Sequence, residues 1–223
     1  MRETLCVIFE RQKTERKIEM NKILILLILF ISPKLFFAQT CLHKSLSKEF
    51  NFKIILTKIK IPNEAIDSNS VKIIIINKKT TQKQEINYGA NFLFGKTFEV
   101  CETVRSYSTG INKNTEIVDN EFGDLIIVDF NFDNREDFAI KNDSGGNGGP
   151  TYNFYIQNEK GKFIFDKYLT EKMEFFPTKF NPKNKELVTY VHANAYQLNE
   201  KTFEFNSKNK NWKVKKQRFV EHY

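Results

Sequence analysis

Apolar and polar residues alternate with a period of two along most of the chain after residue 49. In Phe50–Leu56 and in Tyr152–Ile156 nearly every second residue is aromatic or aliphatic, and Val71–Ile76 is rich in branched side chains. A period of two is typical of β-strands that bury one face. The same pattern predicts further strands over 97–100, 125–132 and 187–196.

Short polar turns join some of these segments into predicted hairpins. Asn158–Gly161 leads from the strand at 152–156 into Phe163–Phe165, and Ser207–Asn211 leads from Phe203–Phe205 into Trp212–Val214. Only the segment 169–176 has a pattern compatible with a short helix. Short strands separated by turns of Asn, Lys and Gly predict an all-β fold, a single antiparallel β-sandwich-like domain. A small propeller-like arrangement is the alternative.

The first 38 residues contain a segment typical of a secretory signal peptide. Met20-Asn21-Lys22 precedes the apolar run Ile23–Ile31. A membrane anchor, the alternative, needs about 20 apolar residues, and Pro33 and Lys34 interrupt this run. We therefore predict an upstream extension from a misassigned start at 1–19, a signal peptide at 20–38 and a mature domain at 39–223. The mature protein is expected to lack a transmembrane helix and to be periplasmic or secreted.

Two cysteines remain once this leader is removed. Cys6 leaves with the leader, and Cys41 and Cys101 stay in the mature chain. In an oxidising compartment two cysteines predict a disulfide, with two free thiols as the alternative. Lipid attachment at Cys41 is not favoured, because Gln39-Thr40 is a poor substitute for the small residues that precede a lipidated cysteine.

Composition and charge exclude some partners. Hydrophobic residues make up 40% of the chain and aromatic residues 14%, as in globular proteins. The formal net charge of +8 permits acidic partners, but the lysines are scattered and form neither a basic helix nor a cluster with arginine. Nucleic-acid binding is therefore not expected. The oligomeric state is left open.

The segment DFNFDNRED, residues 129–137, places oxygen-bearing side chains at alternate positions after an apolar run. Acidic side chains this close repel one another unless a cation or solvent relieves the repulsion. Calcium accepts a flexible set of carboxylate, amide and backbone carbonyl oxygens. The segment supplies such ligands at its first, third, fifth, seventh and ninth positions: Asp129, Asn131, Asp133, the backbone carbonyl of Arg135, and Asp137.

The flanks of this segment indicate the type of calcium loop. An EF-hand has Glu at its twelfth position between two helices, whereas the twelfth residue here is Ile140 and both flanks are predicted strands. We therefore predict a calcium-binding β-hairpin loop like those of integrin-type repeats, with Asn134 where Gly usually makes the turn. A polar turn without metal is the alternative. A transition metal is not expected, since His43, His192 and His222 have no Cys or His at ligand spacing.

A glycine-rich segment, Ser144–Pro150, follows and holds four of the nine glycines. A phosphate-binding loop would need a Lys-Ser/Thr pair and a following helix, but a strand is predicted here. The segment is either a flexible exposed connection or a slim loop, braced by the calcium loop, that enters a partner's cleft. The residues of this candidate partner-binding loop, with an aromatic residue expected at its rim, are Ser144, Gly145, Gly146, Asn147, Gly148, Gly149 and Tyr152.

Together, DFNFDNREDFAIKNDSGGNGGPTYNFYI and the later TYVHANAY resemble the periplasmic immunity proteins first known from Xanthomonas. Members of that family neutralise a peptidoglycan hydrolase delivered by a type IV secretion system, and they are similar to invertebrate-type lysozyme inhibitors. The resemblance covers mainly residues 125–196. It implies calcium ligands at the five positions given above, a loop with Ser144 and Gly145 that reaches the hydrolase's catalytic cleft, and a peptidoglycan hydrolase or lysozyme-like protein as partner.

Catalysis is not expected from this sequence. Asp129 with Asp133, or Glu171 with Glu174, could pair as glycosidase carboxylates. The first pair is better explained as metal ligands. The second pair lies in the segment 169–176, whose helical pattern is weak, and no other candidate catalytic residues accompany it. The remaining alternative to an inhibitor is a calcium-dependent module that binds carbohydrate or a cell surface.

Overall fold

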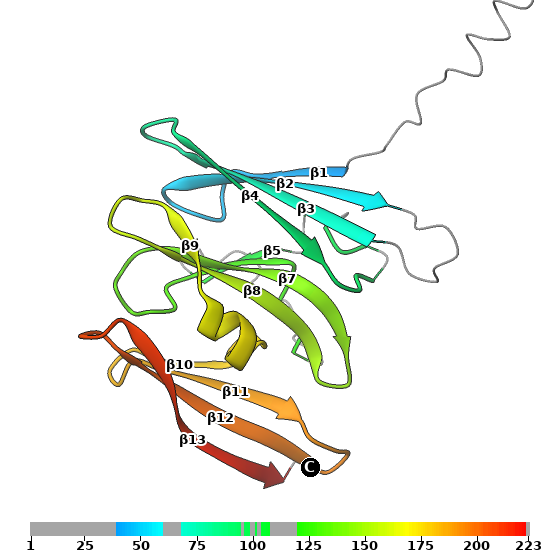
Figure 1. Ribbon diagram of the computed structural model, residues 1–223, viewed down its shortest axis with the longest axis vertical. Coiled ribbons are helices and arrows are strands. Elements are labelled where there is room, and N and C mark those ends of the chain that lie inside the picture. The colour runs from blue at the N-terminus through cyan, green and yellow to red at the C-terminus, as the bar shows by residue number, and fades with distance from the viewer. Residues whose placement is uncertain are drawn as a thin grey trace, which may run out of the picture. The chain divides into compact units, whose positions relative to one another are not determined.

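The computed structural model describes residues 39–59, 68–94, 96–98, 101, 104–107 and 120–221, and the predicted leader lies outside them. The chain from Ala38 to Tyr223 forms one compact unit. Its described strands form three sheets stacked as layers (Figure 1). The strands are β1 (Gln39–His43), β2 (Phe50–Ile59), β3 (Ser68–Asn77), β4 (Lys83–Ala90), β5 (Val104–Ser106), β6 (Leu125–Val128), β7 (Asp137–Gly146), β8 (Gly149–Gln157), β9 (Phe163–Phe165), β10 (Lys179–Asn181), β11 (Glu186–His192), β12 (Gln197–Asn206) and β13 (Asn211–Glu221).

The first sheet, in the order β1-β2-β3-β4, is antiparallel and buries one face. Along β2, Phe52, Ile54 and Leu56 are at most 2% exposed, whereas the residues between them are half-buried. Phe52 pairs with Ile75, and Ile54 pairs with Ile73, which are equally buried. The alternation in the sequence therefore separates the side chains that enter the core from those that do not.

The central sheet, in the order β5-β6-β7-β8-β9, is covered on both faces. All four residues of β6 are buried. Leu125 and Ile127 belong to the core shared with the first sheet, and Ile126 and Val128 belong to the core shared with the third. Double coverage explains why this strand is apolar at every position. β5 and β6 are parallel, and the other pairs of this sheet are antiparallel.

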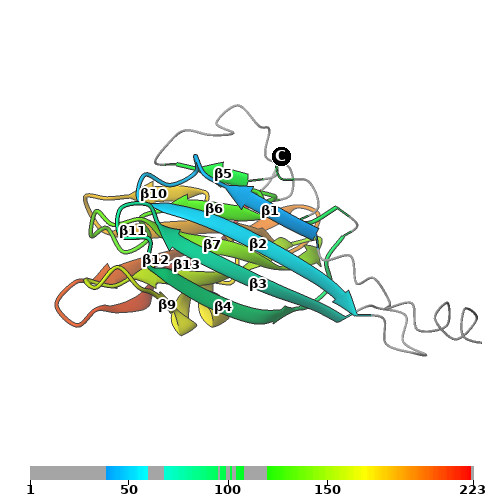
Figure 2. The same cartoon turned by 90° about the horizontal axis from the view of Figure 1, so that it is seen from above.

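The third sheet, in the order β10-β11-β12-β13, packs Leu187, Phe203 and Trp212 against the central sheet. Arg218 and Glu200 form an ion pair across β12 and β13, with Nε and Oε1 2.8 Å apart. The strands of the stacked sheets run in similar directions (Figure 2), as expected for aligned sheet packing.

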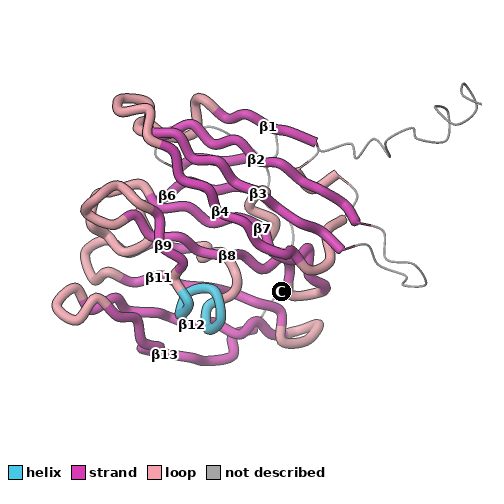
Figure 3. The backbone as a smooth tube through the Cα atoms, turned by 45° about the horizontal axis from the view of Figure 1, so that its top comes forward, coloured by secondary structure: helices cyan, strands magenta, loops and turns pink. Residues whose placement is uncertain are grey.

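The predicted all-β, sandwich-like fold is confirmed, with three stacked sheets. Both predicted hairpins are present, as β8–β9 and β12–β13. The helical segment, cyan in Figure 3, is a π-helix over Leu169–Met173. The part of the chain that the structure describes contains no helix long and apolar enough to cross a membrane.

Three predicted strand segments differ from the structure. The strand predicted over 187–196 ends at His192, and residues 193–196 form a bend before β12 begins. Thr97 and Phe98 lie in a turn, and residues 99–100 lie outside the described residues. The strand predicted over 125–132 ends at Val128, because the carboxylate of Asp129 binds loop N–H groups and the backbone turns there. Asx-type hydrogen bonds of this kind compete with strand pairing.

The predicted disulfide joins Cys41 and Cys101, whose Cα atoms are 5.4 Å apart. Cys41 lies in β1 and is 3% exposed. The bond thus links the first strand to the turn that follows Phe98.

Candidate functional site

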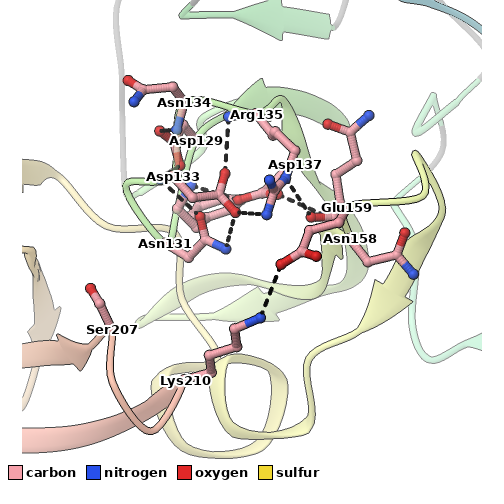
Figure 4. A network of polar contacts seen from close by, with 12 residues as sticks. Asp129, Asn131, Asp133, Asn134, Arg135, Asp137, Asn158, Glu159, Ser207 and Lys210 are labelled. Atoms are coloured by element: carbon pink, nitrogen blue, oxygen red, sulfur yellow. Dashed lines mark hydrogen bonds and ion pairs between the residues drawn. The ribbon is translucent and has the colours of Figure 1, made fainter.

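The acidic segment forms a compact loop between β6 and β7 (Figure 4). The backbone N–H groups of Asp133 and Asn134 donate to the two carboxylate oxygens of Asp129, at 3.1 and 2.8 Å. Phe132 and Asn134 have φ angles of 58° and 66°, in the left-handed region that Asn tolerates and a bulky Phe rarely adopts. The loop is therefore wound tightly around the Asp129 carboxylate.

The Asp133 carboxylate is bound from within the same loop. Nη2 of Arg135 lies 2.5 Å from Oδ2 of Asp133, and Nδ2 of Asn131 donates to that oxygen at 2.9 Å. The other oxygen, Oδ1, accepts the backbone N–H of Arg135 at 2.9 Å. The Nε of Arg135 also donates to the carbonyl of Gln157 at 3.2 Å, which ties the loop to the end of β8.

Asp137 begins β7 and is fully buried. Its oxygens accept the backbone N–H groups of Phe130 and Gln157, both at 2.8 Å. Burial raises the pKa of Asp137 well above its usual value, and the charges of Asp129 and Asp133 raise it further. Burial also raises the pKa of Asp129. The loop thus gathers carboxylates whose repulsion a cation would relieve.

The donor chemistry of this loop suits a hard cation. A carboxylate oxygen that accepts one N–H keeps a lone pair for another partner. In the arrangement described, however, the Arg135 guanidinium neutralises Asp133. No group of three or more His, Cys, Asp or Glu side chains among the described residues is placed to hold a metal. Calcium binding stays a prediction, and it requires the Asp133–Arg135 ion pair to open.

The glycine-rich segment forms the tip of the β7–β8 hairpin. β7 continues to Gly146 and β8 begins at Gly149, so that only Asn147 and Gly148 make the turn. At Gly145, whose φ is 66°, an added Cβ would lie 2.0 Å from the carbonyl oxygen of Gly149. Glycine at this position therefore lets the two strands approach closely. Gly146 and Asn147 are exposed.

Three residues predicted to bind a partner, Ser144, Gly149 and Tyr152, are instead buried. Tyr152 is 1% exposed, and its hydroxyl donates to the carbonyl of Gly123 at 3.0 Å. It packs in the core between the central and third sheets, so the expected role at the rim of an interface is wrong for Tyr152. Ser144 is 7% exposed, and its Oγ accepts the backbone N–H of Phe94 at 2.8 Å.

Two exposed aromatic residues beside the tip escaped the sequence reasoning. The backbone N–H of Ser144 donates to the carbonyl of Phe92 at 2.7 Å, so Ser144 fixes the segment after β4 at both Phe92 and Phe94. Phe92 and Phe94 are 40% and 59% exposed, and their rings meet edge to face with centroids 4.9 Å apart. The signal in the sequence is this aromatic pair on either side of the buried Leu93, where a polar turn would be usual.

The third sheet holds the other side of the hairpin tip. Nδ2 of Asn120 donates to the carbonyls of Gly148 and Tyr190, at 3.1 and 3.0 Å. A Cβ on Gly148 would lie 3.2 Å from Cγ1 of Val191. The tip is therefore fixed between the segment after β4 and strand β11.

No family model matches the chain, and no curated protein matches it. A solved structure described as "Structure of a Xanthomonas Type IV Secretion System related protein" is similar, with a TM-score of 0.53 and 12% sequence identity. The match covers 82% of this chain and 87% of that chain. What the two chains share is the fold. This agrees at the level of fold with the resemblance to Xanthomonas secretion-related proteins.

Proposed function

We propose that this protein is an exported inhibitor, of the immunity type, that blocks a peptidoglycan-cleaving glycosidase with the tip of its β7–β8 hairpin. The observation that carries the proposal is the exposed pair Gly146–Asn147 on a tip braced from both sides. The fold shared with a Xanthomonas type IV secretion system related protein and the disulfide Cys41–Cys101 support export and a link to that system.

The chemistry of the tip suits the cleft of a glycosidase. Such enzymes hold catalytic carboxylates in a groove shaped for a sugar chain. Gly146 and Asn147 add little width, and their backbone N–H groups and the Asn147 amide are donors for carboxylates. Residues 39–223 hold 28 Lys and Arg against 23 Asp and Glu, and this net charge of +5 favours encounter with an acidic cleft. Phe92 and Phe94 would take the role at the rim that Tyr152 does not fill, since exposed aromatic residues often dominate interface energy.

Rigidity favours this mode of binding. Ser144 and Asn120 already fix the tip, so little conformational entropy is lost when a partner binds. At the other end of β7, bound calcium would neutralise the carboxylates of the acidic loop. Its ligands would be Asp129, Asn131, Asp133, the carbonyl of Arg135 and Asp137.

The test is inhibition of peptidoglycan lysis by purified residues 39–223, against a panel of lysozyme-like and secreted muramidases. Asn147→Arg should weaken inhibition at least tenfold, because a long side chain at the tip prevents entry into the cleft. Asn209→Arg, the same change at an exposed turn between β12 and β13, is the matched control and should inhibit normally.

Equal inhibition by wild type and Asn147→Arg would reject the hairpin as the inhibitory element. If no enzyme of the panel is inhibited at micromolar protein while peptidoglycan fragments bind directly, the calcium-dependent carbohydrate-binding alternative replaces the proposal.

A further inference from the structure

A groove lies beside the acidic loop, at the end of β7 away from the hairpin tip. It has a volume of about 710 Å³, within the range of pockets that bind small ligands. Its walls come from the acidic loop, the turn between β8 and β9, and the turn between β12 and β13. In Figure 1 these two turns lie on the left, and the β7–β8 hairpin tip lies on the right.

The floor of the groove is apolar and partly open to solvent. Ile164 and Phe165 of the edge strand β9 are 53% and 45% exposed, which is unusual for large apolar side chains. Phe132 also lines the groove, and its φ of 58° is a strained value for a bulky residue. Strain of this kind persists where the surrounding structure imposes it, often at binding sites. Ile156 and Phe205 complete the apolar lining.

Among the described residues, two lysines on the rim of the groove have no acidic partner. Two of its cations are already paired, Arg135 with Asp133 and Lys210 with Glu159. In the ranges that the structure describes, no ion pair involves Lys160, and Nζ of Lys185 donates only to a neutral hydroxyl, Oγ of Ser207, at 2.6 Å.

The remaining acid of the lining, Asp166, does not neutralise these lysines. Its Oδ1 accepts the backbone N–H of Leu169 at 2.9 Å, at the start of the π-helix. The groove therefore combines an apolar floor with two ammonium groups that have no counter-charge within the described part of the chain.

We propose that this groove binds a short acidic peptide segment, with its carboxylates on Lys160 and Lys185 and an apolar side chain on Ile164 and Phe165. A neutral sugar would leave both rim ammonium groups without a counter-charge, whereas the carboxylates of an acidic peptide supply it. Each lysine offers one compact cation, which suits single carboxylates spaced along a peptide chain. The site does not depend on the proposed inhibition, because it lies at the far end of β7. A partner on the hairpin tip and a peptide in the groove can bind at the same time.

The probe is a fluorescein-labelled peptide of alternating glutamate and leucine, titrated with purified residues 39–223. We expect saturable binding at micromolar to millimolar protein. Amide NMR shifts should concentrate in residues 158–165 and 205–210. Matched peptides with glutamine or lysine in place of glutamate should bind at least tenfold more weakly.

Variants test whether peptide binding depends on the groove or only on the overall charge of the protein. The double change Lys160→Glu and Lys185→Glu should weaken binding at least tenfold, and Phe165→Ser should weaken it severalfold. Lys79→Glu, at an exposed turn in the first sheet, is the matched control and should bind as wild type. If charge reversal disturbs folding, the double variant Lys160→Gln and Lys185→Gln replaces it in this test. Inhibition through the hairpin tip should be unchanged in all of them.

Several results would overturn the proposal. One is a basic or neutral peptide that binds as well as the acidic one, and another is an equal loss in Lys79→Glu. Absence of saturable shifts at millimolar peptide would also reject it, as would shifts in these residues caused only by chito-oligosaccharide or by anionic vesicles.

Discussion

Asp137 and Gly146 lie at opposite ends of the same strand, the ten-residue β7. Two β-bulges shorten β7, and its partner strand β8 spans the same interval with about seven steps of about 3.3 Å, so the two residues are separated by about 23 Å. The expectation that the calcium loop braces the glycine-rich segment is therefore wrong. Ser144 and Asn120 hold that segment instead, through the chain after β4 and through β11. Cation binding and partner binding through the tip are thus separable in experiments.

Calcium should stabilise the protein without changing the hairpin tip. At 100 times its dissociation constant, a ligand that binds only the folded state adds about 2.7 kcal/mol to the free energy of unfolding. Extracellular sites of this kind often have dissociation constants of about 10⁻⁴ to 10⁻³ M, so calcium should reach tens of millimolar. Asp133→Ala should abolish the gain measured by thermal unfolding, and Glu159→Ala should retain it. Identical melting temperatures in chelator and in calcium would refute the site.

Removal of the disulfide should destabilise the fold strongly. Cys41 and Cys101 are 60 residues apart, and closure of such a loop stabilises by about 4 kcal/mol in the chain-entropy model. Cys41→Ala with Cys101→Ala should therefore lower the free energy of unfolding by several kcal/mol in denaturant titrations. The oxidised wild type should show no free thiol from these two residues. Two alkylated thiols in non-reduced, denatured protein would contradict the bond.

The sequence predicts strands well where apolar and polar residues alternate. Alternation identifies β2, which places alternate side chains in a core, and β8, where Tyr152 and Phe154 enter one core while Tyr155 enters the core on the other face. Neither the alternation nor the apolar run Leu125–Val128 reveals that the sandwich has three sheets. That run has the composition of a strand covered on both faces, but the second covering sheet begins with β10 at Lys179, 51 residues after Val128 along the chain.

For the candidate sites, spacing in the sequence predicts which residues share a loop, but not which of them are buried. The spacing of Asp129, Asn131 and Asp133 is local, and these residues do form one loop. Burial of Tyr152 and exposure of Phe94 depend on which segments pack above them, which spacing does not encode. The ion pair between Arg135 and Asp133 is a further case, since the spacing in the sequence assigns only the backbone carbonyl of Arg135 to the site.

Acid should destabilise the protein in part through His43. Burial lowers the pKa of His43 below 6.5, and the charge of Asp124 only partly opposes this. The unfolded chain then binds the proton more readily than the folded chain does, so stability falls as pH drops below about 6.5. His43→Gln should lose less unfolding free energy than wild type between pH 7.5 and pH 5. An equal loss in both proteins would rule out this role for His43.

Two neighbouring glycines should respond differently to the same substitution. Gly145→Ala places a Cβ 2.0 Å from a backbone oxygen at a positive φ, so it should cost at least about 2 kcal/mol. Gly146→Ala meets nothing within 4 Å and should change stability by less than about 1 kcal/mol. Chemical denaturation of both variants measures the difference. Equal stabilities would mean that the strands do not approach as closely as described.

Lys141 should be a large single contributor to stability. It is 4% exposed, and its Nζ lies 2.8 Å from Oδ1 of Asp124 and 2.7 Å from Oε2 of Glu121. Lys141→Met leaves the buried Asp124 charge without this partner, which typically costs about 3–5 kcal/mol.

Combining Lys141→Met with Asp124→Asn should recover part of that loss. The substituted Asp124 side chain keeps an oxygen for the backbone N–H of Phe98, which Asp124 now accepts at 2.9 Å, and the uncompensated charge is gone. The coupling in a double-mutant cycle should therefore be at least about 1 kcal/mol. Additive effects of the two substitutions would show that Asp124 does not depend on Lys141 for its counter-charge.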